Sequence, residues 1–417
     1  MKAGKGLYIA LMVFVVAAAV IFSLVDRGED TVRYHQHLQQ PSEEKLGQKP
    51  ETDELVTHLP IVEIDTKKDG QYQTIPGKAV MDESMNNVIG TAPGENGERE
   101  ITATIKTFEK EGKWHSAADK ADKQSSILVR VRGNSSVAFD KSNYRIKLTQ
   151  EGDPLSSNDM SLLGMGASSD WALHGPFLDK TLIRNYMWMN ISAEVMGYAP
   201  NVRFCELIID GEYKGLYVMM ETIEVEEERV KLTPYEAGDP VMSYMVHIEP
   251  KAELAKSIEN FSFYAKKLEP DRQVEIDYPG EKYLTESVKE YIKTDFSEIE
   301  KAIYSGKAGS DSDFYLDFLD EDSFVDYYII QEFVGNNDMF QASTYLYKDV
   351  RGKLTIGPVW DYNNVLDNYT NVMPAEGFLL SQNGFYSQLM KSERFVNKVI
   401  SRYRELRKGV LSEEHLM

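Results

Sequence analysis

An uninterrupted apolar run near the N-terminus limits how this chain can fold. Residues 7–25 are nineteen in a row without a charge. As a helix at about 1.5 Å per residue they span ~28 Å, close to the hydrocarbon thickness of a bilayer. Lys2 and Lys5 precede the run and acidic residues follow it, which predicts residues 1–6 in the cytoplasm and the rest outside. We expect an uncleaved transmembrane anchor, with a signal peptide cleaved near 17–19 as the alternative.

Charge and cysteine content exclude several classes of protein. The 417 residues include 46 Lys and Arg against 67 Asp and Glu, a net charge of −21. So acidic a chain argues against binding to nucleic acid, which requires a basic face. A single cysteine, Cys205, excludes an internal disulfide and a cysteine-based zinc site. The polar composition of residues 26–58 is typical of a stalk.

From residue 59 onward the patterns predict a mixed α+β protein. Strand-like runs at 61–65, 99–110, 125–133 and 143–149 predict a mainly antiparallel sheet. Helical spacing predicts a helix over 176–197, and Asp210-Gly211 predicts the turn of a hairpin within 205–224. Further helices are expected at 284–306 and 320–338, followed by a second hairpin at 343–361. Strand counting alone supports two lobes and no more.

A basic hairpin is the first candidate site. Two strand-like runs flank a turn of small residues, whose backbone N–H groups could face phosphates while nearby cations neutralise them. An ordinary hairpin with solvated basic side chains is the alternative. The candidate residues are Arg132, Gly133, Asn134, Ser135, Lys141 and Lys147.

Two further segments could position ligands. The helix predicted over 176–197 carries Arg184 and Asn185, which could order catalytic groups or simply belong to an amphipathic helix. Met220 and Glu221 end an apolar strand, where backbone groups could meet an adenine ring. The alternative for these two residues is an ordinary core strand.

Two carboxylates follow regular elements at positions suited to chemistry. Asp338 follows an apolar helix in the sequence GNND, where it could accept a proton from a substrate hydroxyl. A helix C-cap formed by Gly335 and Asn336 is the alternative. Asp361 follows the second hairpin in WDYNN and suits a hard cation such as Mg²⁺. The alternative for Asp361 is a residue that caps a turn.

In chain order, these segments resemble the CotH family of spore-coat protein kinases, which have an atypical protein-kinase-like fold. The resemblance covers residues 59 to the C-terminus. It is carried by the segments RGNSS…KSNYRIKL, LDKTLIRNYMWMNISAEVMGYAP, DGEYKGLYVMMETIE, NNDMFQASTYLYKD and GPVWDYNN. It implies a β-rich N-terminal lobe at about 59–230 and a helical C-terminal lobe at about 231–417. Because family members continue beyond this point, the C-terminus is expected to be a truncation.

The resemblance also assigns roles to the candidate residues. Asp338 resembles the catalytic-loop Asp and Asp361 resembles the Asp that binds metal. Lys147, with Arg132 and Lys141, falls where the phosphates of ATP would be held. Met220 and Glu221 fall where the hinge strand meets adenine.

Two departures from the family pattern concern the metal. The position five residues after Asp338, where kinases place a metal-binding Asn, is Ser343. The family's WDxD is WDYN here, with Asn363 in place of the second carboxylate. Mg²⁺ is the implied ion, and Mn²⁺ is the alternative.

Three functions follow from these observations. The first is an ATP-dependent Ser/Thr kinase that phosphorylates a Ser/Thr-rich coat or surface protein. The second is a pseudokinase that serves as a surface binding or assembly module, which Ser343 and Asn363 favour. The third is an adhesin or carbohydrate binder, suggested by 24 tyrosines in an acidic extracytoplasmic protein.

Overall fold

The computed structural model describes residues 33, 35–38, 43–82, 84, 87–250, 253–307, 313–368 and 376–417. The expected membrane anchor at 7–25 lies outside these residues. Within the described ranges, no helix is long and apolar enough to cross a bilayer. Residues 40–417 form one compact unit, separate from residues 1–39, and all elements named below belong to it.

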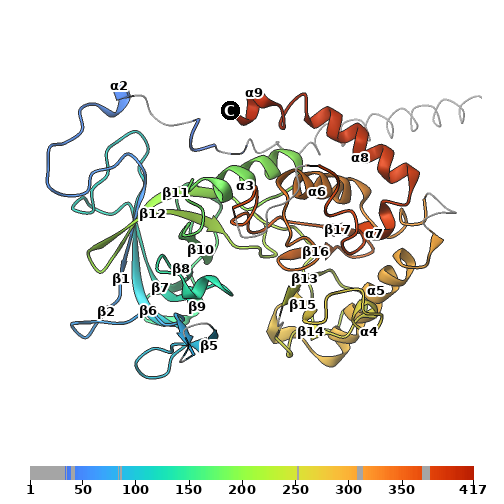
Figure 1. Cartoon of the computed structure of the whole chain (residues 1–417). Helices are drawn as coiled ribbons and strands as arrows, with labels where there is room; N and C mark the ends of the chain where they lie inside the picture. The colour runs from blue at the N-terminus through green and yellow to red at the C-terminus, as the bar shows by residue number, and fades with distance from the viewer. Residues whose placement is uncertain are drawn as a thin grey trace, which may run out of the picture. The chain divides into compact units, whose positions relative to one another are not determined.

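Seven strands between residues 61 and 221 close into a barrel (Figure 1). Their order is β10-β12-β11-β1-β6-β7-β8, and β8 also pairs with β10, which closes the ring. β1 and β11 run parallel, whereas β1–β6, β6–β7 and β7–β8 are antiparallel, which confirms the expected sheet. The strands are β1 (Ile61–Asp65), β6 (Ile101–Phe108), β7 (Lys123–Arg132), β8 (Asn143–Gln150), β10 (Asp170–His174), β11 (Val202–Ile209) and β12 (Glu212–Glu221).

Apolar side chains at alternate positions of the strands fill the inside of the barrel. Ile146 of β8 pairs with Val129 of β7 on one side and Trp171 of β10 on the other. All three side chains are fully buried. Because side chains in a strand point alternately to opposite faces, the residues between them face outward. The sequence predicted these strands except β10, and it did not predict that the sheet closes.

Short elements decorate the barrel. The polar segment assigned to the stalk contacts the loop between β6 and β7, where the Trp114 indole N–H donates to the Gly47 carbonyl at 3.2 Å. The small elements are α2 (Glu43–Leu46), β2 (Lys67–Lys68), β3 (Gln71–Tyr72), β4 (Ala79–Met81), β5 (Val88–Thr91) and β9 (Asp153–Ser157), with the 3₁₀ turn η1 (Ser136–Ala138). A second 3₁₀ turn, η2 (Glu281–Tyr283), lies between β15 and α5.

The β11–β12 hairpin confirms the predicted turn. Asp210 and Gly211 have φ values of 53° and 79°, the left-handed conformation that a two-residue hairpin turn requires.

The helix expected over 176–197 is shorter than predicted, because α3 covers only Arg184–Val195. The Asp179 carboxylate accepts the backbone N–H of Arg184 at 2.8 Å, and Leu182 has a positive φ of 66°. This segment therefore forms a loop.

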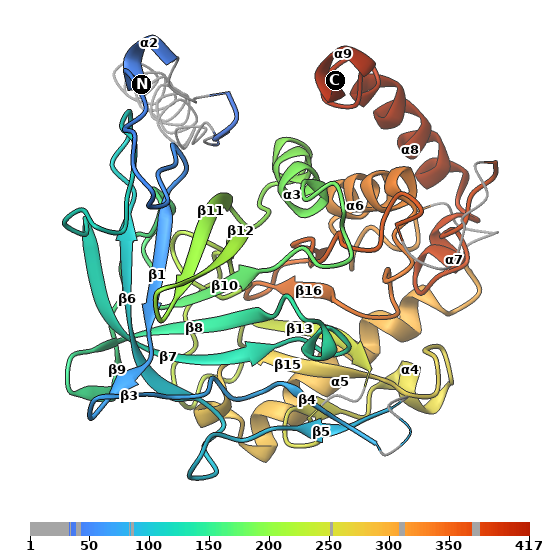
Figure 2. The same cartoon turned by 60° about the vertical axis from the view of Figure 1, so that its left-hand side comes forward.

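A second sheet, which the sequence analysis only partly predicted, lies beyond the barrel (Figure 2). Its order is β14-β15-β13-β16-β17. The β16–β17 hairpin was expected, but β13 and β15 were not, so the region after 231 is mixed rather than helical. The strands are β13 (Tyr244–Pro250), β14 (Ser257–Ile258), β15 (Arg272–Tyr278), β16 (Thr344–Lys348) and β17 (Leu354–Ile356).

Helices cover one face of this second sheet. α5 and α6 confirm two predicted helices, and α6 begins at the Asp320 cap, whose side chain accepts the Ser323 N–H. It ends at Gly335, which is left-handed with φ 64°, as a helix C-terminus favours. The helices are α4 (Phe261–Tyr264), α5 (Glu286–Ile303), α6 (Glu321–Val334), α7 (Tyr386–Leu389), α8 (Glu393–Leu406) and α9 (Glu413–Leu416).

The two faces of the second sheet differ in character. Val246 and Ile248 of β13 share a core with Ile292 of α5 and Ile330 of α6. Met220 of β12 belongs to the same core, so barrel and sheet are packed together. The opposite face of β13 and β15 carries polar side chains, and it forms the floor of the candidate site.

Candidate active site

A cavity of about 750 Å³ lies between the β7–β8 hairpin, the polar face of the second sheet and the loops that follow α6 and β17. It brings together residues that are far apart in the sequence. The predicted site residues that line it are Arg132, Gly133, Asn134, Ser135, Met220, Asp338, Ser343 and Asp361. Lys141, Lys147 and Glu221 are not among its lining residues.

Asn336 connects the two loops that carry the carboxylates. Its side chain is buried, with 5% exposed. The Asn336 Oδ1 accepts the backbone N–H of Asp338 at 3.1 Å, and its Nδ2 lies 3.5 Å from the Asp361 carbonyl oxygen. Gly335 forms the C-cap that was offered as the alternative for this segment. The cap and the placement of Asp338 are compatible, because Gly335 turns the chain toward the cavity.

Asp338 has the electrostatic setting of a proton acceptor. Burial, together with the negative charges of Asp361 and Glu249, raises the pKa of its carboxyl from 3.8 to about 7, and the charge of Arg272 opposes this shift. A group that ionises near neutral pH can take up a proton from a substrate and release it again. The Asp338 carboxylate is therefore suited to general base catalysis.

Asp361 lies beside a fixed cation. Burial raises the pKa of its carboxyl, while the backbone N–H of Asn363 and the charge of Arg132 lower it. The Asn363 N–H donates to Asp361 Oδ1 at 3.0 Å. The Arg132 guanidinium lies 5.1 Å from the centre of the Trp360 ring, a cation–π contact that holds it in the cavity wall. Burial lowers the pKa of Arg132, yet a guanidinium stays charged in proteins.

Asn185 of α3 fixes the loop around Asp361. Its amide Nδ2 donates to Asn363 Oδ1 at 2.6 Å and lies 3.1 Å from His174 Nε2. Its Oδ1 accepts the Tyr362 N–H at 2.8 Å. Burial and the charge of Arg132 lower the pKa of His174 to about 4, so this imidazole is neutral near pH 7. Asn185 therefore orders a loop at the cavity. Of the two interpretations of this helix offered from the sequence, this contact favours the ordering of groups at a site over a plain amphipathic helix.

Three predicted residues make contacts elsewhere. Lys141 donates from Nζ to the Lys214 carbonyl at 3.0 Å and lies over the Tyr217 ring. Lys147 points out of the barrel, opposite Asp170 of β10 in the strand register.

Glu221 is fully buried and serves as an acceptor within the barrel. Its carboxylate accepts the Asn201 N–H at 2.8 Å and the Tyr198 hydroxyl at 3.0 Å. The structure therefore ties Glu221 to the start of β11.

The polar floor of the cavity was not predicted from the sequence. His247, Glu249 and Glu275 come from β13 and β15 and line the cavity. The Ser343 N–H donates to Glu249 Oε2 at 3.3 Å, so Glu249 lies beside the position where kinases carry a metal-binding Asn. The available signal was the alternation V-H-I-E at 246–249 and V-E-I-D at 274–277, which is typical of strands with one polar face.

Comparison with protein families gives a match over most of the chain. The family model described as CotH kinase protein matches residues 129–417. The match begins in β7 and includes every cavity residue named above. No curated protein matches the chain.

Proposed function

Because the chain belongs to the CotH kinase protein family, we propose that it transfers the γ-phosphoryl group of ATP to a Ser or Thr hydroxyl of a protein. The observation that carries this proposal is the convergence of Asp338, Asp361 and Arg132 in one cavity. Phosphoryl transfer needs positioned groups and charge neutralisation rather than a covalent nucleophile. In this proposal the barrel and the mixed region beyond it take the places of the two lobes of a kinase.

The cavity fits a divalent metal at Asp361. Its carboxylate interacts electrostatically with Asp338 and Glu249, and repulsion among these acids favours a bound cation. Mg²⁺ would be held by Asp361, with the Ser343 hydroxyl as a weak second donor and Mn²⁺ as the alternative ion. When bound, the metal neutralises charge on the phosphates. Asn363 does not supply the negative charge of the missing carboxylate, and its amide oxygen, which accepts one hydrogen bond from Asn185, keeps one lone pair free for a weak contact.

The chain's own residues would orient the reactants. Arg132 would hold the phosphates, and the turn after it would offer backbone N–H groups. Gly133 has a φ of 125°, a backbone conformation that residues with a Cβ rarely adopt, so this turn favours glycine. Asp338 would accept the proton of the substrate hydroxyl while the hydroxyl oxygen forms a bond to the γ-phosphorus and ADP departs.

A binding module without transfer is the second candidate. Asn363 favours it, because a neutral amide oxygen that already accepts a hydrogen bond from Asn185 holds a metal more weakly than the carboxylate of the family pattern. In that case the cavity would still bind nucleotide, and Asp338 would serve no chemical step.

A transfer assay tests the proposal. The full chain, purified in detergent, is incubated with labelled ATP, Mg²⁺ or Mn²⁺ and a Ser-rich acceptor protein. We expect transfer by the wild type, its loss in Asp338→Asn, and the loss of both transfer and nucleotide binding in Asp361→Ala. Asp53→Asn, which removes an exposed carboxylate, is the matched control. Nucleotide binding without transfer by the wild type would favour the binding module instead.

We further propose that residues 7–25 anchor the protein in the membrane and that residues 59–417 act outside the cytoplasm on a coat or surface protein. Protease treatment of intact cells tests this topology. Digestion of the C-terminal region from outside is expected, and its protection would contradict the proposal.

A further inference from the structure

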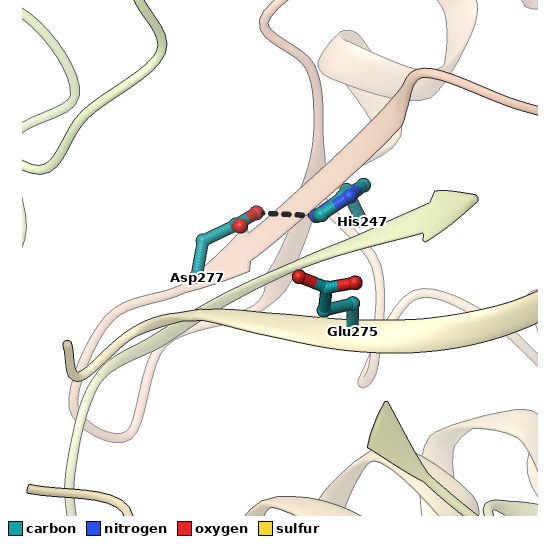
Figure 3. Close-up of side chains that lie close together, drawn as sticks. All are labelled: His247, Glu275 and Asp277. Carbon is teal, nitrogen blue, oxygen red and sulfur yellow. Dashed lines mark hydrogen bonds and ion pairs between the residues drawn. The ribbon is translucent and has the colours of Figure 1, made fainter. Parts of the chain in front are cut away.

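We propose that His247, Glu275 and Asp277 bind one divalent transition-metal ion on the floor of the cavity, at a site separate from Asp361. One possible ligand atom from each residue lies within 4.8 Å of the others. Figure 3 shows the three side chains converging from the second sheet. The inference does not depend on the proposed transfer of phosphate.

The strand register creates this cluster. His247 of β13 is directly opposite Glu275 of β15. Asp277 lies two residues further along β15 and therefore on the same face of the sheet. The Tyr345 ring stacks on the His247 ring with centroids 5.2 Å apart, which fixes the plane of the imidazole. Three ligating side chains are thus held on regular structure, where their positions vary least.

The carboxylate of Glu275 is buried with little compensation. Only 9% of Glu275 and 8% of His247 is exposed. One Glu275 oxygen accepts the Glu253 N–H at 2.9 Å, and the other is 4.0 Å from the Lys256 ammonium. A Glu275 carboxylate oxygen lies in the cluster. Among the described residues, the nearest cation to Glu275 Oε1 is Lys256, at the limit of an ion pair. Burying a carboxylate in this way is costly unless a cation approaches it.

Charge balance points to a dication. His247 Nδ1 and Asp277 Oδ2 share a hydrogen bond of 2.7 Å. With a neutral imidazole, Glu275, Asp277 and the nearby Glu249 carry three negative charges. The Lys256 ammonium supplies one positive charge against them. A divalent ion in place of the shared proton would balance these charges.

The donor set indicates the type of metal. Imidazole nitrogen with carboxylate oxygens suits Zn²⁺, Mn²⁺ or Co²⁺, whereas Mg²⁺ prefers oxygen alone. Metal–ligand bonds of about 2.1 Å place ligand atoms roughly 3.4 Å apart in a tetrahedral site. The observed separations, all within 4.8 Å, require only small side-chain movements to reach that geometry. The backbone N–H of Glu253 and the Tyr345 ring already hold two of the three ligands from behind.

Co²⁺ binding without nucleotide tests this inference. The full chain in detergent is stripped of metal and titrated with Co²⁺, and visible absorption reports coordination by imidazole. We expect one tight equivalent per chain and at least a tenfold loss of affinity in His247→Gln and in Glu275→Gln, as removal of a ligand predicts. Circular dichroism of both variants shows whether they fold. Glu275→Gln is the milder of the two changes, because it leaves the hydrogen bond between His247 and Asp277 in place.

Two controls separate this site from others. His35 and His37 lie close together, with ring centroids 5.7 Å apart, so the His35→Gln/His37→Gln variant detects adventitious capture. This variant and Asp361→Ala are expected to retain the tight Co²⁺ equivalent. Absence of tight binding, or binding lost only in the His35/His37 variant, would overturn the inference. Nucleotide binding is measured separately, so failure of the kinase proposal leaves this result unaffected.

Discussion

Replacing Asp338 by Asn is expected to stabilise the protein above neutral pH, although the same change abolishes the proposed transfer. The carboxyl has a pKa of about 7 in the folded state against an ordinary value of 3.8. The cause is burial together with the charges of Asp361 and Glu249. Asn has the shape of the protonated carboxyl and no charge, so it removes the repulsion.

The sign and size follow from proton linkage. A raised carboxyl pKa means that the folded state binds the proton more tightly. Its stabilising effect is therefore complete below about pH 4 and is lost as pH rises to about 7. A shift of about three pKa units at 1.36 kcal/mol each is about 4 kcal/mol in the free energy of unfolding. We expect Asp338→Asn to exceed the wild type by at most about 4 kcal/mol at about pH 8, and by less than half of that at about pH 5.

Urea unfolding at both pH values, followed by circular dichroism in the presence of EDTA, measures this difference. Asp53→Asn removes an exposed charge of the same kind and is expected to change stability little at either pH. The reasoning is refuted if Asp338→Asn is no more stable than the wild type at about pH 8. It is also refuted if the advantage of the variant does not grow with pH.

Three other changes have expected outcomes. Glu221→Gln weakens the buried bonds to Asn201 and should lower stability by about 1–3 kcal/mol in urea unfolding without changing nucleotide affinity; a loss of affinity in a protein of normal stability would place Glu221 at the nucleotide. Arg132→Lys keeps the charge but loses the planar contact with Trp360, and should weaken ATP binding about tenfold by calorimetry, a cost of ~1.4 kcal/mol; unchanged affinity would contradict its role. Asn185→Ala frees the loop of Asp361 and should lower the turnover rate while changing the KM for ATP little. A variant with the stability and turnover rate of the wild type would show that other contacts hold the loop.

Local patterns in the sequence were sufficient for most elements around the site. The strands β6, β7 and β8, the β11–β12 turn and the helices α5 and α6 all follow from side-chain period and from capping residues. The motifs around Asp338 and Asp361 pointed to the same cavity. The family model over 129–417 confirms the resemblance that those motifs suggested.

The strands whose role could not be predicted from the sequence are β13 and β15, whose two faces serve different purposes. β13 and β15 alternate apolar and polar residues, and the alternation alone does not say that the polar face lines a cavity inside the molecule rather than its outer surface. Lys147 and Glu221 belong to the predicted motifs but do not line the cavity, and a position in a motif does not say which way a side chain points.

By itself, the sequence determined many of the local elements and turns and the motifs that carry the candidate residues, because these depend on residues within a few positions of one another. Only the tertiary structure decided that β8 pairs with β10 to close the barrel. It also decided that His247 lies opposite Glu275 and that Arg132, Asp338 and Asp361 share a cavity. Those outcomes depend on strand register and packing between segments far apart in the chain, and side-chain period carries no information about which distant strand becomes the neighbour.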